Sequence, residues 1–491
     1  MTSLSESRAS STRNPALRVR RPTRALVAIA LAALGPVGCR LKNPPTPDEL
    51  RPYAVPNAVV PPGWVAAPVD TAPPAESWLS SFGDQALIAL VSEALVHNTD
   101  LEVAAARVDQ AAGHLRLAGA PVKPTVDVSA RGGIGMGGDQ SGINGVLIRA
   151  GWELDLWGRV RYGKAAAGAA YAASQADLAY ARQSIAAMVA KSYFTIAELR
   201  LQGRLTDSLA QASSQRLELI RVRQQVGNAG DQEVSLSRAD LGGYLNRRLQ
   251  LTQAEAEAKR ALEVLVGRYP SATIATTATL PDSLPNVPAG LPLRILERRP
   301  DLIAANYRVA AAFYAKKQAV TAKLPAISLT GSFGAISSEV LQLADDFSNP
   351  VGSIGAALLA PIYRGGELNA QIDIRTAEQR AAVAAYGQAM LKAFQEVENA
   401  LAAEQYLNQR RDIVSQLVQD RSRSVEVAQT RFAVGREDLM SGLEQRVGLY
   451  GAGTELLTVR TERIMQRINL HLSLGGSFVA LPDSAAAPRV P

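Results

Sequence analysis

The sequence predicts a mixed, mostly α-helical protein in which one unit occurs twice, and each copy carries a short β-hairpin. Aromatic residues form only 5% of the 491 residues, and alanine supplies much of the 47% hydrophobic fraction. This composition suits long helices whose backbones pack closely. Apolar residues recur at three- and four-residue spacing, as in Leu241, Leu245 and Leu249, which is typical of packed helical hairpins. Two glycine-rich segments instead alternate polar and apolar residues, as half-buried strands do.

An internal duplication organises most of the chain. Residues of the same type recur in the two halves at one constant shift. They are Asp100, Leu101, Ala104, Arg107 and Val108 in the first half, and Asp301, Leu302, Ala305, Arg308 and Val309 in the second. Two copies of one unit are therefore expected at about 84–290 and 291–476. With their flanking residues, the two repeats are assigned to 78–290 and 291–478.

The N-terminal segment, 1–38, has the features of a lipoprotein signal peptide. A cationic stretch precedes an apolar run over 25–34. This run is too short to cross a bilayer, which requires about 20 apolar residues. Gly38 then precedes the single cysteine, Cys39, whose thiol is expected to carry the lipid. Arg40 follows without the aspartate that retains lipoproteins in the inner membrane, so the outer membrane is expected. The alternative is an ordinary signal peptide with an incidental cysteine.

The segments that flank the duplicated units differ from them in composition. Residues 39–77 are rich in proline, and we expect an extended spacer there. Residues 479–491 are expected to form a disordered tail.

Each unit has the same expected order of elements. A helix of about 35 residues leads into a hairpin, at about 125–154 in the first copy and about 326–361 in the second. A very long helix follows, at about 160–226 and 366–434. After a glycine turn, a second helix returns through about 232–266 and 437–474. At a rise of 1.5 Å per residue, each outgoing helix would reach roughly 100 Å.

The amphipathic hairpins point to a membrane. Strands of about ten residues suit a transmembrane barrel, and a soluble helical repeat would not explain them. Two hairpins supply only four strands, which cannot close a barrel, and an unpaired strand edge is costly in a bilayer. Several chains must therefore combine, and three would supply about 12 strands, an even number within the range of outer-membrane barrels. The helices would continue this barrel as a water-filled tube.

Several motifs together carry a family resemblance. The chain resembles the TolC-like outer-membrane factor family, and within it the NodT-type outer-membrane lipoproteins of RND efflux systems. The resemblance extends from about Trp78 to Phe478. Its residues include Trp78, Phe82, Asp84, Asn98, Trp152, Asp155, Trp157, Gly158, Arg159, Gly267, Leu284, Pro285, Pro288, Gly290, Pro292, Arg298, Arg299, Pro300, Pro361, Tyr363, Gly365, Gly366, Phe394, Glu396, Val397, Glu398, Leu474, Gly475 and Gly476.

The resemblance implies a fold, a function and partners. The fold is a homotrimer in which four β-strands per chain complete a 12-stranded transmembrane β-barrel above a long periplasmic α-helical barrel. The implied function is a passive exit duct for drugs, toxic compounds or metal ions, lipid-anchored in the outer membrane, with no catalytic residue, cofactor or metal. The implied partners are a periplasmic adaptor (membrane fusion protein), an inner-membrane RND transporter and outer-membrane lipid.

The two glycine turns are the candidate functional sites. By the resemblance, Val226 and Gly227 of the first copy and Val434 and Gly435 of the second are periplasmic tips that dock the adaptor. Acidic residues just beyond such tips hold the entrance shut and select cations in the family. Glu233 and Glu444 match those positions, whereas Ser441 stands where some members carry a further acid. The competing interpretation makes both glutamates ordinary charges on a helix surface.

Other chemistries fit the sequence poorly. A single cysteine excludes a disulfide scaffold, and much of the net charge of +7 lies in the first 24 residues, so nucleic acid is not an expected partner. The stretch from Gly158 to Lys164 has the spacing of a phosphate loop, but Ala165 replaces the required Ser or Thr. We interpret it as a cationic strand-to-helix corner. Two alternatives remain: an exit duct for type I protein secretion, and a periplasmic coiled-coil adaptor with one helical hairpin beside a lipoyl-like β-domain.

Overall fold

The computed structural model describes residues 41–66, 78–131, 144–276, 279–281, 284, 287–337 and 350–476. All helices and strands named below belong to one compact unit, Asn43–Pro491. The predicted signal peptide, Cys39, and the predicted tail lie outside the described residues.

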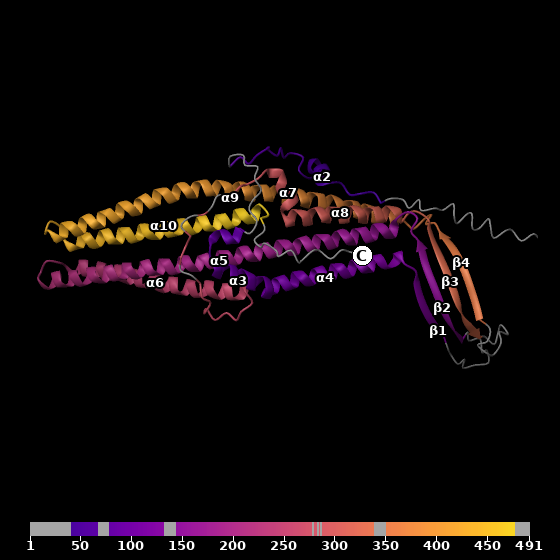
Figure 1. The fold of residues 1–491 in the computed structure, drawn as a ribbon, viewed down its shortest axis with the longest axis horizontal. Coiled ribbons are helices and arrows are strands. Elements are labelled where there is room, and N and C mark those ends of the chain that lie inside the picture. The colour runs from indigo at the N-terminus through magenta and orange to yellow at the C-terminus, as the bar shows by residue number, and fades with distance from the viewer. Residues whose placement is uncertain are drawn as a thin grey trace, which may run out of the picture. The chain divides into compact units, whose positions relative to one another are not determined.

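The two halves of the described chain contain matching sets of elements (Figure 1). The first half comprises η1 (Trp78–Phe82), α3 (Gln85–His97), α4 (Thr99–Gly119), β1 (Thr125–Arg131), β2 (Asn144–Leu154), α5 (Arg159–Gln225) and α6 (Asp231–Leu265). The second comprises α7 (Ile295–Arg298), α8 (Pro300–Thr321), β3 (Ala326–Ser337), β4 (Pro350–Leu359), α9 (Glu367–Ala433) and α10 (Leu439–Ser473). Helices α5 and α9 each have 67 residues, and α6 and α10 each have 35. Their ends lie within about two residues of the expected positions.

The helical hairpins α5–α6 and α9–α10 pack against each other, mainly through α5 and α10. Their two turns lie at the end away from the strands (Figure 1). The main core lies around the middle of α5, where Tyr193 and Phe194 are fully buried. Helix α5 also packs against α4 and α8, which lead into the strands.

The prediction of a single helix of about 35 residues before each hairpin is wrong, because each copy has two separate helices there. In the first copy the helix breaks at Asn98, which has an extended conformation with ψ 123°. The Asn98 side chain accepts a hydrogen bond from the backbone N–H of Leu101 (3.1 Å) and donates one to the carbonyl of Leu265 (2.9 Å). In the second copy Arg299 is extended before Pro300, because proline disfavours a helical conformation in the residue that precedes it.

The prediction that residues 39–77 are extended is wrong for eight of them, which form helix α2 (Pro47–Ala54). Thr46 caps this helix in a capping box with Glu49, and proline is tolerated in the first helical turn. Leu50 of α2 is buried with Val309 and Tyr386, so burial against the second repeat holds the helix in place.

The four strands form one antiparallel sheet in the order β1-β2-β3-β4. Within it, β2 of the first copy pairs with β3 of the second, for example Trp152 with Leu329. The sequence predicted the two hairpins separately and did not predict that they pair.

A buried histidine gives the helical core an acid-sensitive group. His471 of α10 stacks on Trp78, with ring centroids 5.2 Å apart and an interplanar angle of 13°. Burial, followed by the nearby charge of Arg467, lowers the pKa of His471 to about 4. The unfolded chain, with an ordinary histidine pKa near 6.5, therefore binds more protons than the folded chain between these two values.

This difference predicts that His471 destabilises the fold as the medium is acidified. The histidine's contribution to the free energy of unfolding is complete above pH 6.5 and falls by about 2 kcal/mol between pH 7 and pH 5. His471→Phe, which keeps a ring beside Trp78, should flatten the pH dependence by that amount in chemical unfolding experiments. His114→Phe, at an exposed position of α4, serves as the control. Equal pH profiles for wild type and His471→Phe would contradict the prediction.

Candidate functional site: an amphipathic sheet and two helical tips

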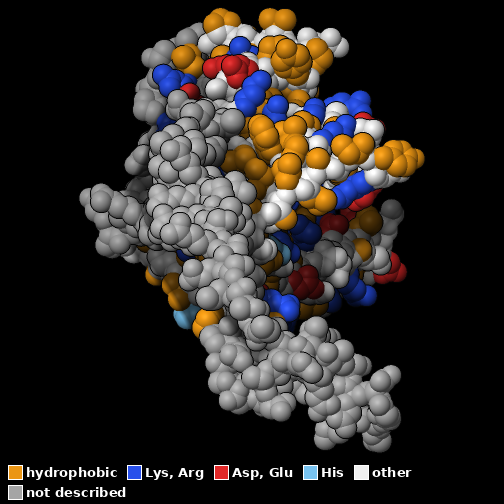
Figure 2. Space-filling view, turned by 90° about the vertical axis from the view of Figure 1, so that its right-hand side faces the viewer, with side chains coloured by type: hydrophobic (Ala, Val, Ile, Leu, Met, Phe, Trp, Pro, Cys, Tyr) orange, Lys and Arg blue, Asp and Glu red, His pale blue; other side chains and the backbone are white. Residues whose placement is uncertain are grey.

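One face of the sheet is apolar and exposed. The register places cross-strand partners on the same face, so that Val128 of β1, Ile148 of β2 and Phe333 of β3 lie in one row. The large side chains of this face are between 37% and 97% exposed, and they are Val126, Val128, Val146, Ile148, Trp152, Leu329, Phe333, Ile354 and Leu358. Figure 2 shows the molecule from the side on which the strands lie in Figure 1. Hydrophobic side chains gather on this side of the surface. An apolar surface of this kind indicates contact with an apolar environment.

The opposite face carries the polar side chains of the strands, including Asp127, Arg149 and Ser353. Among the described strands, β1 pairs only with β2, and β4 pairs only with β3. The sheet therefore has two edges whose backbone groups remain available for pairing with another chain.

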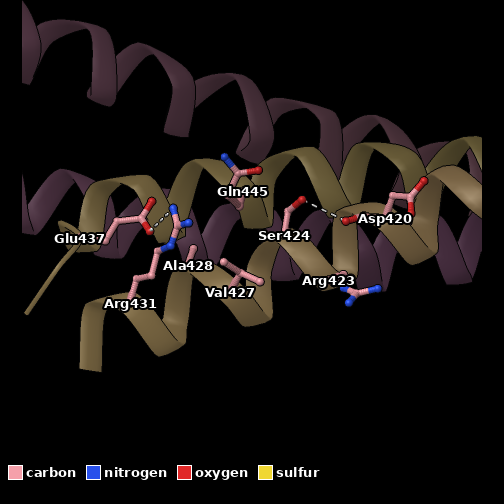
Figure 3. Close-up of a pocket in the computed structure, with 8 residues that line it drawn as sticks. All are labelled: Asp420, Arg423, Ser424, Val427, Ala428, Arg431, Glu437 and Gln445. Atoms are coloured by element: carbon pink, nitrogen blue, oxygen red, sulfur yellow. Dashed lines mark hydrogen bonds and ion pairs between the residues drawn. The ribbon is translucent and has the colours of Figure 1, made fainter. Parts of the chain in front are cut away.

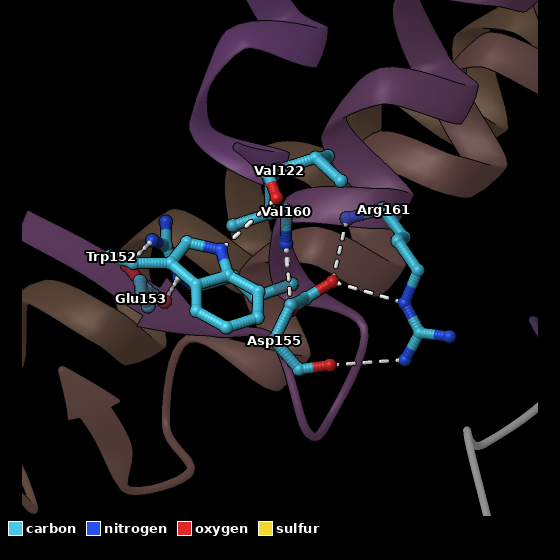
Figure 4. A network of polar contacts seen from close by, with 7 residues as sticks. Val122, Trp152, Glu153, Asp155, Val160 and Arg161 are labelled. Carbon is cyan, nitrogen blue, oxygen red and sulfur yellow. Dashed lines mark hydrogen bonds and ion pairs between the residues drawn. The ribbon is translucent and has the colours of Figure 1, made fainter. Parts of the chain in front are cut away.

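A polar network fixes the corner between β2 and α5 (Figure 4). The carboxylate of Asp155 accepts hydrogen bonds from the backbone N–H groups of Val160 (3.0 Å) and Arg161 (2.9 Å), and the guanidinium of Arg161 donates a further bond (3.1 Å). Trp152 donates its indole N–H to the carbonyl of Val122 (3.0 Å), tying β2 to the short 3-10 turn (Ala120–Val122) that follows α4. Asp155 thus occupies the anion-binding end of α5, and the stretch that follows Gly158 is a corner, as expected, and not a phosphate loop.

The two predicted tips have the same backbone geometry. Gly227 and Gly435 have positive φ values of 76° and 69°. In each turn the glycine N–H and the following N–H donate to carbonyls of the last helical turn: Gly227 to Gln224 (3.0 Å) and Gly435 to Phe432 (2.9 Å). This pattern is a Schellman motif, which favours glycine at the left-handed position. Val226 and Val434, which directly precede the glycines, are 66% and 64% exposed.

Contacts that sequence reasoning missed join the two tips. Arg223, in the last turn of α5, forms an ion pair of 2.6 Å with Asp438, the N-cap residue of α10. Met440 of α10 packs against a buried cluster of the first tip that includes Leu217 and Val234. The helix-terminal positions of Arg223 and Asp438 could have marked them as candidates. Their pairing could not be found, because the two residues are 215 positions apart in sequence.

A groove lies beside the second tip, between α9 and α10 (Figure 3). It has a volume of about 480 Å³, and charged residues line much of it. Arg431 and Glu437 approach to 3.9 Å on one side of the groove. Glu437 also accepts a hydrogen bond from Ser441, which by the family resemblance stands where some members carry a further acid.

The two predicted gate residues lie where the sequence placed them along the helices. Glu233 is in the first turn of α6, and Glu444 is near the start of α10. Both side chains are exposed, and neither takes part in an ion pair within the part of the chain that the structure describes. Nothing in the geometry of a single chain distinguishes them from ordinary surface charges, so their gate role stays a prediction.

Neither a metal site nor an apolar helical span is present among the described residues. No cluster of three or more His, Cys, Asp or Glu residues is arranged to hold a metal there. None of the described helices has a stretch both apolar and long enough to cross a bilayer.

Comparison with known proteins identifies the family. The model of the outer membrane efflux protein family matches residues 90–268 and 291–476. The probable efflux pump outer membrane protein TtgC of Pseudomonas putida is 30% identical over 93% of this chain and 96% of its own length. The pyoverdine export outer membrane protein OpmQ of Pseudomonas aeruginosa is 30% identical over 84% of this chain and 90% of its own. The solved structure of the outer membrane protein VceC of Vibrio cholerae superposes with a TM-score of 0.74 at 25% identity, covering 83% of this chain and 100% of that one.

The chain therefore belongs to the outer membrane efflux protein family. Its fold is that of the TolC-like outer-membrane channels, and the predicted family, fold class and efflux function are confirmed. The family and the fold are those of channel proteins. The alternative of a periplasmic adaptor does not fit, because the described residues form two helical hairpins and an amphipathic sheet instead of one hairpin beside a lipoyl-like domain.

Proposed function

We propose that three copies of this chain form an outer-membrane exit duct of a tripartite RND-type efflux system. The duct passively conducts drugs, toxic compounds or metal ions that an inner-membrane RND transporter delivers through a periplasmic adaptor. The observation that carries this proposal is the sheet, which combines one exposed apolar face with two open edges.

The physical argument concerns the strand edges. In a bilayer core each unsatisfied backbone group costs several kcal/mol, so a four-stranded sheet must pair its edges with other sheets. Joining β4 of one copy to β1 of the next closes a barrel of about 12 strands with the apolar face toward lipid. The polar face then lines the lumen, and the helices continue the duct into the periplasm. The similarity to efflux proteins favours efflux over the alternative of type I protein secretion.

A charge on the apolar face tests this arrangement. Ile354, at the middle of β4, is 97% exposed. Ile354→Arg should destabilise the assembled barrel by about 2 kcal/mol or more per chain, because an arginine near the bilayer midplane is costly. The neighbouring Ser353→Arg, on the opposite face, should be tolerated. The measurement is the yield of a heat-modifiable trimer in outer-membrane fractions on unboiled gels, and equal yields for both variants would contradict the assigned lipid face.

The tips would form the periplasmic entrance. Three copies of Glu233 and Glu444 would surround the narrow end of the duct, and the Arg223–Asp438 ion pair would hold the two hairpins of each chain together there. A ring of carboxylates favours cations. Glu444→Lys should therefore shift the reconstituted channel from cation preference toward anion preference in reversal-potential measurements. Glu257→Lys, an exposed position further along α6, is the control, and unchanged selectivity in Glu444→Lys would contradict the gate assignment.

The same tips would dock the adaptor. Exposed Val226 and Val434 supply apolar contacts beside Gly227 and Gly435, and the groove beside Arg431 supplies charged ones. Val434→Asp should weaken capture of the channel by a purified adaptor while leaving the trimer intact. Full capture by this variant would contradict docking at the second tip.

The outer-membrane location would be reinforced by a lipid on Cys39. One acyl chain anchors a protein weakly and two chains anchor it stably. Palmitate labelling of the wild type that disappears in Cys39→Ala is the expected result. Unchanged labelling of the variant would exclude Cys39 as the lipid attachment site.

A further inference from the structure

Lysines collect where the sheet joins the helices. Five of the nine lysines in the whole sequence lie in the connections between strands and helices or in the adjoining helix ends, and we name this group the lysine rim. Its members are Lys123, Lys164, Lys316, Lys317 and Lys323. The four stretches 116–124, 155–165, 314–325 and 360–370 together contain nine basic and only two acidic residues.

The strand register places these stretches at one end of the sheet. The pairs Leu154 with Ile327 and Ala326 with Leu359 align the end of β2, the start of β3 and the end of β4. The start of β1 pairs close to the same end, at Gly151. The rim therefore surrounds the border at which the apolar face stops and the helices begin.

Direct contacts keep the adjoining helix ends together. The aliphatic part of Lys164, in the second turn of α5, lies against Gly119 at the end of α4. Lys323, after α8, donates a hydrogen bond to the side chain of Asn369 in the first turn of α9. Trp157 donates its indole N–H to the carbonyl of Pro325, just before β3 (2.8 Å).

Ion pairs within the described residues do not balance the positive charges of the rim. Two nearby carboxylates are already engaged, Glu153 with Arg159 (2.6 Å) and Asp155 with Arg161 (3.1 Å). Glu367, the other acidic residue of the four stretches, has no ion pair with a rim lysine within the described residues. None of the five rim lysines forms an ion pair within the part of the chain that the structure describes, whereas Lys259, on a helix of the α5–α6 hairpin, pairs with Glu255. The rim thus presents ammonium groups that lack a carboxylate partner within the described chain.

Exposed aromatic side chains accompany the rim. Trp157 is 42% exposed and Tyr363 is 88% exposed, and each follows the end of a strand. Trp and Tyr favour the interface between hydrocarbon and headgroups, because one part of each ring is apolar and the other is polar. Long lysine side chains likewise extend from an apolar surface toward headgroups.

We infer that the lysine rim binds the phosphate groups of anionic phospholipids in the periplasmic leaflet of the outer membrane. The inference rests on the proposed function, which directs the apolar face to lipid and the helices to the periplasm. The lipid phosphates then lie at the level where the apolar face ends, in contact with the rim. Continuity of the rim with the apolar face and its aromatic side chains favours a phospholipid over a polymeric periplasmic partner such as peptidoglycan. Lys164, the lysine of the stretch that has the spacing of a phosphate loop, is in this inference a ligand of lipid phosphate.

The test measures lipid selectivity of the full chain. The purified trimer is incorporated into nanodiscs that contain equal amounts of phosphatidylglycerol and phosphatidylcholine, stripped of loosely bound lipid, and its retained lipids are quantified by mass spectrometry. Each lysine near an anionic surface contributes about fivefold in affinity. The wild type should therefore retain phosphatidylglycerol over phosphatidylcholine by at least about tenfold.

A variant of the rim and a matched control isolate the effect. The rim variant combines Lys123→Gln, Lys164→Gln, Lys316→Gln and Lys323→Gln, and it should retain both lipids about equally. The control removes the same charge at exposed positions on α5 and α6 through Arg204→Gln, Arg238→Gln, Arg247→Gln and Arg260→Gln. The control should keep the selectivity of the wild type.

Three results would overturn the inference. Selectivity that persists in the rim variant, or is absent from the wild type, excludes the rim as a lipid site. A rim variant that keeps lipid selectivity but loses binding to purified peptidoglycan assigns the rim to that polymer. If the wild type forms a trimer and inserts but lacks selectivity, only this inference fails, whereas a wild type that does neither overturns the proposed function as well.

Discussion

Replacing Arg299 with methionine is expected to lower the free energy of unfolding by about 3 kcal/mol or more. The side chain is buried where α8, α9 and α10 meet. Its guanidinium bonds both carboxylate oxygens of Asp301 (3.0 and 2.7 Å), forms an ion pair with Glu396 (2.8 Å), and donates to the carbonyl of Ser473 (3.1 Å). Burial alone would lower the pKa of Arg299, but Asp301 and Glu396 raise it above its ordinary value.

The size of the effect follows from what remains after the substitution. Two carboxylates and a buried carbonyl lose their partner, and breaking a buried ion pair from one side costs about 3–5 kcal/mol. The lower part of that range applies because Asp301 and Glu396 keep side-chain exposures of 26% and 37%. Arg294→Met, which removes the exposed ion pair with Glu297, should cost at most about 1 kcal/mol. Unfolding in denaturant measures the free energy of unfolding of both variants. Similar losses of stability in the two variants would contradict the prediction that the buried contacts of Arg299 stabilise the fold more than an exposed ion pair does.

Gly267→Ala is expected to destabilise the chain by about 2–5 kcal/mol, the sum of a backbone and a packing cost. Gly267 follows the end of α6 with φ 77°, a conformation that costs a residue with a side chain about 1–2 kcal/mol. An alanine Cβ would also stand 2.5 Å from the carbonyl oxygen of His97. Because that atom is backbone, the α3–α4 break beside it would have to move, which adds about 1–3 kcal/mol.

Gly227→Ala separates the two costs. Gly227 has nearly the same φ of 76°, but no atom lies within 4 Å of an added Cβ. This variant should therefore show the backbone cost alone, about 1–2 kcal/mol, and the difference between the variants measures the close approach to His97. Equal losses of stability in the two variants would mean that α3 and α4 accommodate the methyl group freely.

The long helices and the glycine turns could be predicted from the sequence because their signals are local. Apolar residues at helical spacing mark α6 along Leu241, Leu245 and Leu249, and Gly227 and Gly435 mark the ends of α5 and α9. The strand positions could be predicted for the same reason, since alternation of polar and apolar residues determines which side chains share a face. The exposed positions of Glu233 and Glu444 followed from these helices, but their role in a gate involves neighbouring copies and stays a prediction.

The missed features depend on contacts between distant residues. The break at Asn98 requires the carbonyl of Leu265, 167 positions away, to accept a hydrogen bond from its side chain. Helix α2 depends on burial of Leu50 against Tyr386 of the second repeat. The ion pair of Arg223 with Asp438 likewise joins two different helical hairpins.

By itself, the sequence determined that this chain is a duplicated set of long helices with four amphipathic strands, because periodicity and glycine position act within a few residues. Only the tertiary structure decided that β2 pairs with β3, and this pairing unites two apolar hairpin faces into one surface with two open edges. It also gathered the lysines of three separate junctions between helices and strands at one end of that surface. Hydrogen-bond register and packing between distant segments set these arrangements, and no local pattern encodes them.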